Sequence, residues 1–209
     1  MKARARGAAA IEQALNAAAR EGRCALITYL TLGYPSPADS LRLIRALADA
    51  GADVIELGVP FSDPVADGPV IQHASQHALQ AGMTPRGCLE LAAAARTSGI
   101  ATPLVLMGYY NPILNLGLEH YARLCREAGV DGLIVPDLPP EEGTPLEAAC
   151  AAEGLALIYL AAPTSSPERQ ALIASRTRGF LYLVSRLGTT GGGQLPLDGL
   201  RTELATLHS

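Results

Sequence analysis

Three carboxylates lie close together in one short stretch of the chain. Residues 54–70 read VIELGVPFSDPVADGPV, with Glu56 in the aliphatic part and Asp63 and Asp67 in the part rich in Gly and Pro. An ionised carboxylate is costly to bury unless it is paired or faces a wet cavity. An acid at position 56 with apolar neighbours should have a raised pKa, and it could donate and accept a proton near neutral pH. The stretch therefore indicates acid–base chemistry.

A second acid could share this work. Asp67 follows Glu56 by 11 residues, and a loop of that length can fold back over the same end of the strand. Two carboxylates in different surroundings can divide the acid and base roles. The alternative is structural: Glu56 is an ion-paired core acid, and Asp63 and Asp67 are turn formers beside Pro64 and Gly68. Spacing alone leaves both interpretations open.

The elements that must position these acids alternate along the chain. Six extended aliphatic runs are separated by Ala- and Leu-rich segments, and the runs are residues 24–30, 53–57, 103–108, 131–136, 155–160 and 179–185. Strands that are apolar on both faces and alternate with helices indicate a parallel sheet. Among the helical segments, residues 38–50 follow Ser36 and Pro37 and stop at Gly51, as start and stop signals require. The N-terminal segment predicts an amphipathic helix, with Ile11 and Leu15 on one face.

A parallel sheet of this kind is either an open doubly wound sheet or a barrel. The turn after the first run, TLGYPSPAD, contains no G-x-G-x-x-G fingerprint. Polar residues follow several different strands, as on the C-terminal face of a (β/α)8 barrel. The phrases AGADVIEL and AGVDGLIV, about 78 residues apart, indicate a repeated βα unit. We therefore predict one barrel domain over residues 1–209 with about six βα units, two fewer than a complete barrel.

In such a barrel the period of the second strand orients Glu56. Side chains alternate between the two faces, so Val54, Glu56 and Gly58 share one face while Ile55 and Leu57 share the other. If the two aliphatic residues pack outward on helices, Glu56 points into the barrel mouth. This expectation depends on the register of a single strand.

Other motifs are less specific. SRLGTTGGGQ (185–194) could hold a phosphate through backbone amides, but it lacks the G-K-[ST] ending of a nucleotide loop, and a lid or a linker is equally allowed. His73 and His77 have a metal-compatible spacing without a third ligand, so we predict an exposed or helix-capping pair and no metal. Tyr109, Tyr110 and Tyr182 near strand ends could line a pocket for a planar ring or belong to the core.

Composition excludes several classes of function. The net charge of −4 offers no broad basic surface, which argues against nucleic acid as the main partner. No apolar run is long enough to span a membrane, and the N-terminus lacks the apolar core of a secretory signal. Four cysteines without a CxxC pair predict buried free thiols in a reducing cytoplasm, and they are Cys24, Cys88, Cys125 and Cys150.

Five segments together resemble the tryptophan synthase α chain family. They occur in the family's order and are LTLGYP (30–35), AGADVIELGVPFSDPVADGPVIQ (50–72), MGYYNP (107–112), GVDGLIVPDLP (129–139) and YLVSRLGTTG (182–191). The resemblance implies a (β/α)8 barrel that cleaves indole-3-glycerol phosphate into indole and glyceraldehyde 3-phosphate without a cofactor of its own. It also implies a β-chain partner that carries pyridoxal phosphate, in a cytoplasmic complex of two α and two β chains.

The resemblance also implies roles for individual residues. Glu56 matches the acid/base that moves the proton at indole C3, and Asp67 matches the acid that takes the indole N–H. Asp63 matches a loop residue that communicates with the β chain. Tyr29, Tyr109 and Tyr182 match the lining of the indole pocket, and Thr190 and Gly191 match a mobile loop, of which Gly191 also meets the phosphate.

The match stops at LRTELATLHS, in what the pattern predicts as the sixth helix. In the family two more βα units follow and supply most of the phosphate site. We therefore expect a C-terminally short barrel with weak affinity for the phosphate substrate. Two functions stay open at this point: an active lyase α subunit, and a non-catalytic remnant that only binds or modulates a β chain.

Overall fold

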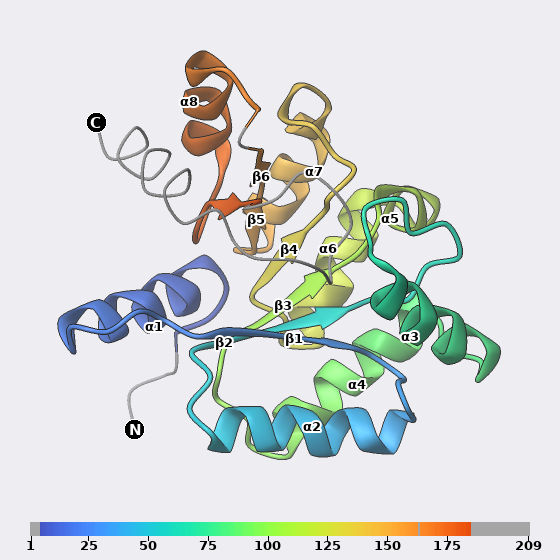
Figure 1. Ribbon diagram of the computed structural model, residues 1–209. Helices are drawn as coiled ribbons and strands as arrows, with labels where there is room; N and C mark the ends of the chain where they lie inside the picture. Colours follow the sequence, from blue (N-terminus) through green and yellow to red (C-terminus); the bar gives the residue numbers. More distant parts are fainter. Residues whose placement is uncertain (1–4, 163, 185–209) are drawn as a thin grey trace.

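The strands of this protein form a curved parallel sheet with most of the helices on its outer side (Figure 1). The computed structural model describes residues 5–162 and 164–184. Five strands pair in chain order, and they are β1 (Ile27–Thr31), β2 (Val54–Gly58), β3 (Leu104–Met107), β4 (Gly132–Ile134) and β5 (Ala156–Ile158). After one residue the chain continues as β6 (Leu160–Ala161), which pairs in parallel with β7 (Tyr182–Leu183). All six predicted extended runs therefore contain strands.

Eight helices connect or precede these strands within the described residues. They are α1 (Ala8–Arg20), α2 (Pro37–Asp49), α3 (Pro69–Gln80), α4 (Pro85–Thr97), α5 (Tyr110–Leu116), α6 (Leu118–Glu127), α7 (Pro140–Ala152) and α8 (Pro167–Arg176). The predicted signals of α2 are confirmed: the Ser36 hydroxyl accepts a hydrogen bond from the Asp39 amide at 3.1 Å, and Gly51 has a φ of 92°. A strand order that follows the chain order is that of a barrel and not of a doubly wound sheet.

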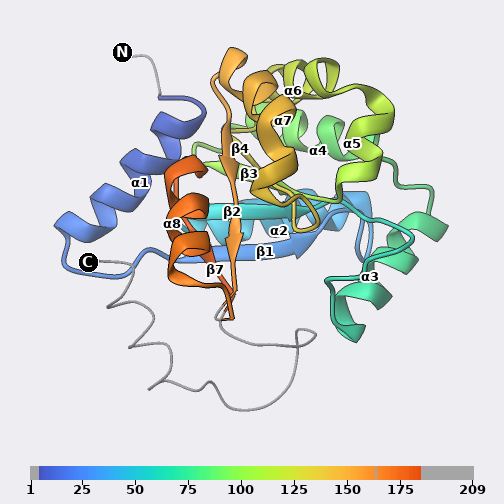
Figure 2. The same cartoon turned by 90° about the horizontal axis from the view of Figure 1, so that it is seen from above.

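Side chains on the two faces of the sheet form two separate apolar clusters. Ile55 and Leu57 are fully buried in the cluster packed against the helices. Val54 belongs to the other cluster, on the concave face, together with Ile11 of α1. Figure 2 shows α1 beside the sheet and α8, so this helix covers one end of the concave face. The predicted faces of β2 and the predicted apolar face of α1 are both confirmed.

The repeated phrase noted in the sequence has a structural cause. Asp53, the residue before β2, accepts a hydrogen bond from the backbone amide of Leu26 at 2.8 Å. Its two carboxylate oxygens also accept bonds from the Arg23 guanidinium at 2.7 and 2.8 Å. The aspartate therefore joins the start of β2 to the start of the neighbouring strand.

Asp131 occupies the matching position before β4. Its carboxylate accepts hydrogen bonds from the Leu104 amide at 3.0 Å and from the Gly7 amide at 2.9 Å, and it pairs with the Arg96 guanidinium. Asp131 is fully buried, so this pair and these amides replace the water that its charge has lost. The bond to Gly7 also fixes the start of α1 against the barrel.

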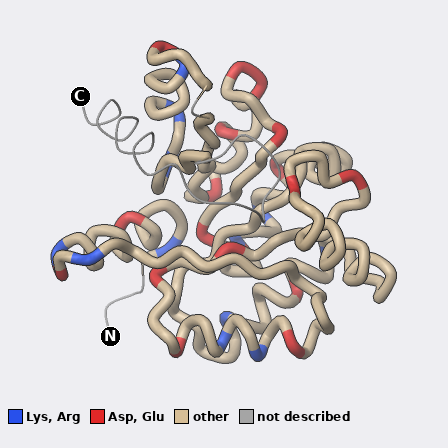
Figure 3. Tube along the Cα trace, viewed as in Figure 1, with Lys and Arg blue, Asp and Glu red and all other residues tan. Residues whose placement is uncertain are grey.

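Charged residues are unevenly distributed over the elements. Figure 3 shows acidic and basic positions mixed along the helices and loops. Within the described strands, Glu56 is the one charged residue. None of the described helices is long and apolar enough to cross a bilayer. A carboxylate inside an otherwise apolar strand is the feature that the fold itself does not require.

The cysteine prediction is partly wrong. Cys88, Cys125 and Cys150 are buried free thiols, as expected, but Cys24 is exposed. Cys24 comes before the start of β1, in the connection from α1, and so the strand that was predicted from residue 24 begins only at Ile27.

Candidate active site

Glu56 lies on the concave face of β2 with little access to solvent. Glu56 is in register with Tyr29 of the neighbouring β1 and with Val105 of the neighbouring β3. Its side chain is buried, and the residue is only 5% exposed. Burial raises the pKa of the carboxyl group to about 7. Among the described residues, no basic side chain pairs with Glu56. Within the described part of the chain, Glu56 is therefore not an ion-paired core acid.

Asp67 is positioned by an aromatic clamp. The Tyr109 hydroxyl donates a hydrogen bond to Asp67 Oδ2 at 3.1 Å and accepts one from the Ala66 amide at 3.0 Å. Phe61, from the same loop as Asp67, stacks on Tyr109 with ring centroids 5.0 Å apart and an interplanar angle of 29°. Tyr109 therefore holds the loop after β2 at two points, and one of them is the carboxylate.

The surroundings of Asp67 act on its pKa in two directions. Burial raises the pKa of the carboxyl above its ordinary value, and the hydrogen bond from Tyr109 lowers it in part. Asp67 also ends a turn, because its amide donates to the Pro64 carbonyl oxygen at 3.1 Å. The turn-forming interpretation is thus correct for its backbone, while its side chain faces the tyrosine.

Two further tyrosines lie within the electrostatic influence of these acids. The pKa of Tyr29 is raised to about 12, chiefly by burial and in part by the charges of Asp67 and Glu56, while the hydrogen bond with Thr31 opposes the rise. Burial and the charge of Glu56 likewise raise the pKa of Tyr182 in β7. The structure therefore brings together Glu56, Asp67, Tyr29 and Tyr182 from four places in the sequence, at the carboxyl end of the sheet.

A glycine makes room for the Tyr29 ring. A Cβ at position 58 would lie 2.1 Å from the Tyr29 hydroxyl oxygen, so any other residue at Gly58 would displace the ring. The hydroxyl lies 3.3 Å from Thr31 Oγ1. Gly58 and Phe61 are parts of this site that no sequence motif predicts, although Phe61 is one of only two phenylalanines in the chain and lies in the acid-bearing loop.

The other residues predicted from the sequence lie either on the exposed surface or outside the described part of the chain. Asp63 is exposed on the loop after β2, and its carboxylate accepts a hydrogen bond from the Ser62 hydroxyl. His73 and His77 are exposed on α3, where both rings lie nearly perpendicular to the Tyr34 ring, and His77 Nε2 lies 3.1 Å from the Pro35 carbonyl oxygen. Thr190 and Gly191 lie outside the described residues.

A Tyr109→Phe variant should raise the pKa of Asp67 above its value in the parent chain, because it removes the hydrogen bond that favours the ionised form. Nuclear magnetic resonance titration of the Asp67 side-chain carbonyl carbon measures this directly. Tyr110→Phe is the matched control, since the adjacent Tyr110 contributes its backbone amide, and not its ring, to the hydrogen bond with Asp137. An unchanged Asp67 titration in Tyr109→Phe would show that the clamp does not act on the carboxylate.

This chain matches one protein family over most of its length. The sequence profile of a family described as "Tryptophan synthase alpha chain" matches residues 15–209. The tryptophan synthase alpha chain of Dehalococcoides mccartyi is 51% identical over 177 residues, which cover 84% of this chain and 69% of that protein. The alpha chain of Caulobacter vibrioides is 51% identical over 181 residues, which cover 87% of this chain and 66% of that protein. This chain thus spans about two thirds of the length of these relatives.

Solved structures give the same relationship. The chain superposes on Mycobacterium tuberculosis tryptophan synthase with a TM-score of 0.88 and 37% identity, covering 95% of this chain and 75% of the other. It superposes on tryptophan synthase subunit alpha from Legionella pneumophila with a TM-score of 0.85 and 38% identity, covering 94% and 72%. At these identities the likeness extends beyond the fold to the sequence.

Proposed function

This chain belongs to the tryptophan synthase alpha chain family, and on that premise we propose that Glu56 and Asp67 cleave indole-3-glycerol phosphate. The family's alpha chains are (β/α)8 barrels and lyases that release indole and glyceraldehyde 3-phosphate. The observation that carries the proposal is the buried Glu56 carboxyl, whose pKa of about 7 lets it both hold and give up a proton at neutral pH.

The cleavage needs four proton transfers, two at each acid, and they balance. Glu56 in its acid form donates a proton to indole C3, and Asp67 takes up the N–H proton as positive charge develops on the ring. The bond between C3 and the glycerol chain then breaks, and its electron pair returns to the ring as Asp67 gives back the proton. The Glu56 carboxylate accepts the proton of the substrate hydroxyl that becomes the aldehyde. Each acid ends in its starting state, so neither needs a cofactor.

We propose that the three tyrosines line the pocket for the indole ring. The charge of Glu56 acts on Tyr29 and on Tyr182, and the Tyr109 hydroxyl donates a hydrogen bond to Asp67. These phenols are protonated at neutral pH, so they present neutral hydroxyls and ring faces to an apolar substrate. We assign Thr190 and Gly191 to the loop that closes over the substrate, on the family resemblance alone.

The partner, location and domain assignments are proposals of the same kind. The exposed Asp63 loop supports contact with a tryptophan synthase β chain, in a complex of two α and two β chains. Pyridoxal phosphate belongs to that partner, and this chain uses no cofactor of its own. Three buried thiols without disulfides support a reducing, cytoplasmic environment. The sequential sheet supports a single barrel domain.

Indole release from indole-3-glycerol phosphate by the purified chain, with and without the β chain, tests the proposed function. We expect release that depends on enzyme concentration and increases when the partner is present. A folded chain, verified by circular dichroism, that releases no indole in either condition would overturn the lyase assignment for this chain. It would favour the alternative of a non-catalytic partner of a β chain.

A further inference from the structure

A cleft lies at the other end of the strands from Glu56, between α7 and α8. It has a volume of about 560 Å³, within the range of small-molecule sites. Its apolar floor contains Leu155 and Leu157, which are 4% and 3% exposed, and Cys150. Ala8 of α1 also lines it. Because Leu155 precedes β5, this cleft lies where the strands begin, away from the proposed active site.

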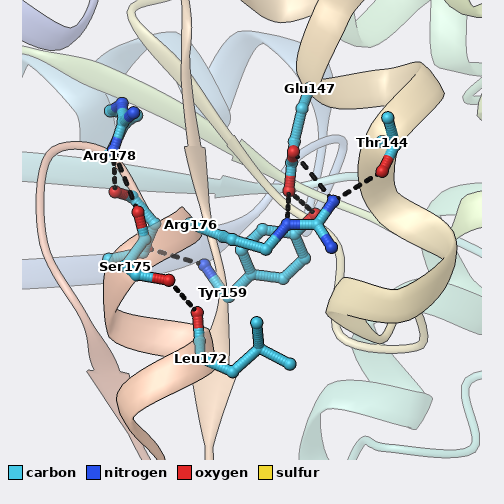
Figure 4. Close-up of polar contacts among 8 residues, drawn as sticks. Thr144, Glu147, Tyr159, Leu172, Ser175, Arg176 and Arg178 are labelled. Atoms are coloured by element: carbon cyan, nitrogen blue, oxygen red, sulfur yellow. Dashed lines mark hydrogen bonds and ion pairs between the residues drawn. The ribbon is translucent and has the colours of Figure 1, made fainter.

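One wall of the cleft is formed by an ion pair between Arg176 and Glu147. The Arg176 guanidinium crosses from the end of α8 to α7, where it donates to Glu147 at 2.8 and 2.9 Å and to the Thr144 hydroxyl at 2.7 Å (Figure 4). The Tyr159 hydroxyl donates to Glu147 Oε1 at 2.7 Å. Burial would raise the pKa of Glu147, but the bonds from Arg176 and Tyr159 hold it below the ordinary value. The pair is therefore ionised at neutral pH and contributes no net charge.

A second guanidinium of the cleft, that of Arg178, forms no close ion pair with a described acid, although its charge contributes to the lowered pKa of Glu147. One guanidinium nitrogen of Arg178 donates hydrogen bonds to the carbonyl oxygens of Ser175 and Thr177, at 3.3 and 3.1 Å. In Figure 4 its guanidinium lies apart from the one of Arg176. An Arg has five N–H donors in a planar fork that suits a carboxylate. Burial raises the pKa of the Cys150 thiol to about 12, so it stays neutral, and the lining carries a net positive charge from Arg178.

We propose that this cleft binds a small monocarboxylate with an apolar body. The carboxylate lies against the free side of the Arg178 fork, and the hydrocarbon covers Leu155 and Leu157. A dianion such as phosphate fits less well, because Arg178, the one lining cation outside the Arg176–Glu147 pair among the described residues, would face two negative charges beside the Glu147 carboxylate and an apolar floor. The ligand would contact α7, the end of α8 and the start of α1, and so binding stabilises the packing of these three helices.

Benzoate is the probe for this site, and benzamide and acetate are its controls. Benzamide has the same shape without the charge, and acetate has the charge without the ring. We expect benzoate to bind with a dissociation constant of about 1 mM or below by calorimetry. We expect the two controls to bind at least about tenfold more weakly, because each lacks one of the two contacts. Methyl resonances of Leu155 and Leu157 should shift with benzoate.

Two variants test separately the charge of Arg178 and the shape of the cleft. Arg178→Gln should weaken benzoate binding at least about tenfold, whereas Arg20→Gln, on the exposed side of α1, should leave it unchanged. Ala148→Leu, at the exposed rim of the cleft, should reduce binding without removing a charge. Should either cleft variant fail to fold, the other still tests the site.

The proposal is overturned if benzoate and benzamide bind equally, or if Arg178→Gln and Ala148→Leu both retain the parent affinity. Absence of binding at 10-fold above the expected constant would overturn it as well. A Glu56→Gln variant should bind benzoate like the parent. Loss of benzoate binding in that variant would place the ligand in the proposed active site instead.

Discussion

Replacing Glu56 by Gln is expected to slow indole release from indole-3-glycerol phosphate at least about a hundredfold, the effect of losing a general acid/base. Gln has nearly the same shape as Glu but cannot donate a proton to indole C3 or accept one from the substrate hydroxyl. The assay is indole release with the β chain present. Since the two proton transfers use one carboxyl group, turnover should fall much more than substrate affinity.

The matched control is Glu90→Gln. The Glu90 side chain lies on α4, is 72% exposed and forms an ion pair with Arg86 at 3.6 Å, so its replacement should leave turnover unchanged. The parent enzyme should also respond to pH: if protonation of C3 limits the rate, turnover declines as pH rises through about 7. Near-parent turnover in Glu56→Gln would refute the role given to this residue.

The orientation of Glu56 is predictable because it depends on one strand. Alternation of side chains places Glu56 opposite Ile55 and Leu57, and the apolar character of those two residues determines which face meets the helices. The raised pKa then follows from burial, since none of the residues that the structure describes contributes a charge or hydrogen bond to it. Local periodicity is therefore enough to predict both the position and the chemistry of this acid.

The position of Asp67 could not be predicted in the same way. Asp67 lies in a loop, and its carboxylate is held by Tyr109, 42 residues further along the chain. That contact depends on the pairing of β2 with β3 and on the stacking of Phe61, neither of which has a local pattern. The sequence indicated that the loop could return to the mouth of the barrel, but not which side chain would hold it there.

The repeated phrase is another feature whose presence, but not its structural cause, is visible in the sequence. The similarity of the segments around Asp53 and Asp131 is visible in the sequence, and it correctly indicated a repeated βα unit. Its cause, a carboxylate that accepts the amide at the start of the neighbouring strand, appears only once the strand order is known. The cleft between α7 and α8 is likewise not predictable from the sequence, because its ion pair joins Arg176 to Glu147, 29 positions apart.

Glu56→Gln should also make the folded chain more stable at pH 8, by up to about 3 kcal/mol. The folded pKa of about 7 lies above the ordinary value of 4.5. Below pH 4.5 the carboxyl is protonated in both the folded and the unfolded chain. Between pH 4.5 and 7 the unfolded chain releases this proton and the folded chain keeps it, so stability falls as pH rises. Above pH 7 the folded protein contains a buried charge without a partner among the described residues.

Chemical denaturation of the parent and of Glu56→Gln at pH 5 and pH 8 measures this effect. The difference in unfolding free energy between the two proteins should be small at pH 5 and large at pH 8, because Gln is neutral at both. Glu90→Gln should show no such change, since an exposed carboxyl keeps its hydration. A difference that does not depend on pH, or a less stable variant at pH 8, would contradict the raised pKa. A gain in stability together with lost turnover would show that the family's chemistry needs a carboxylate that the fold alone would exclude.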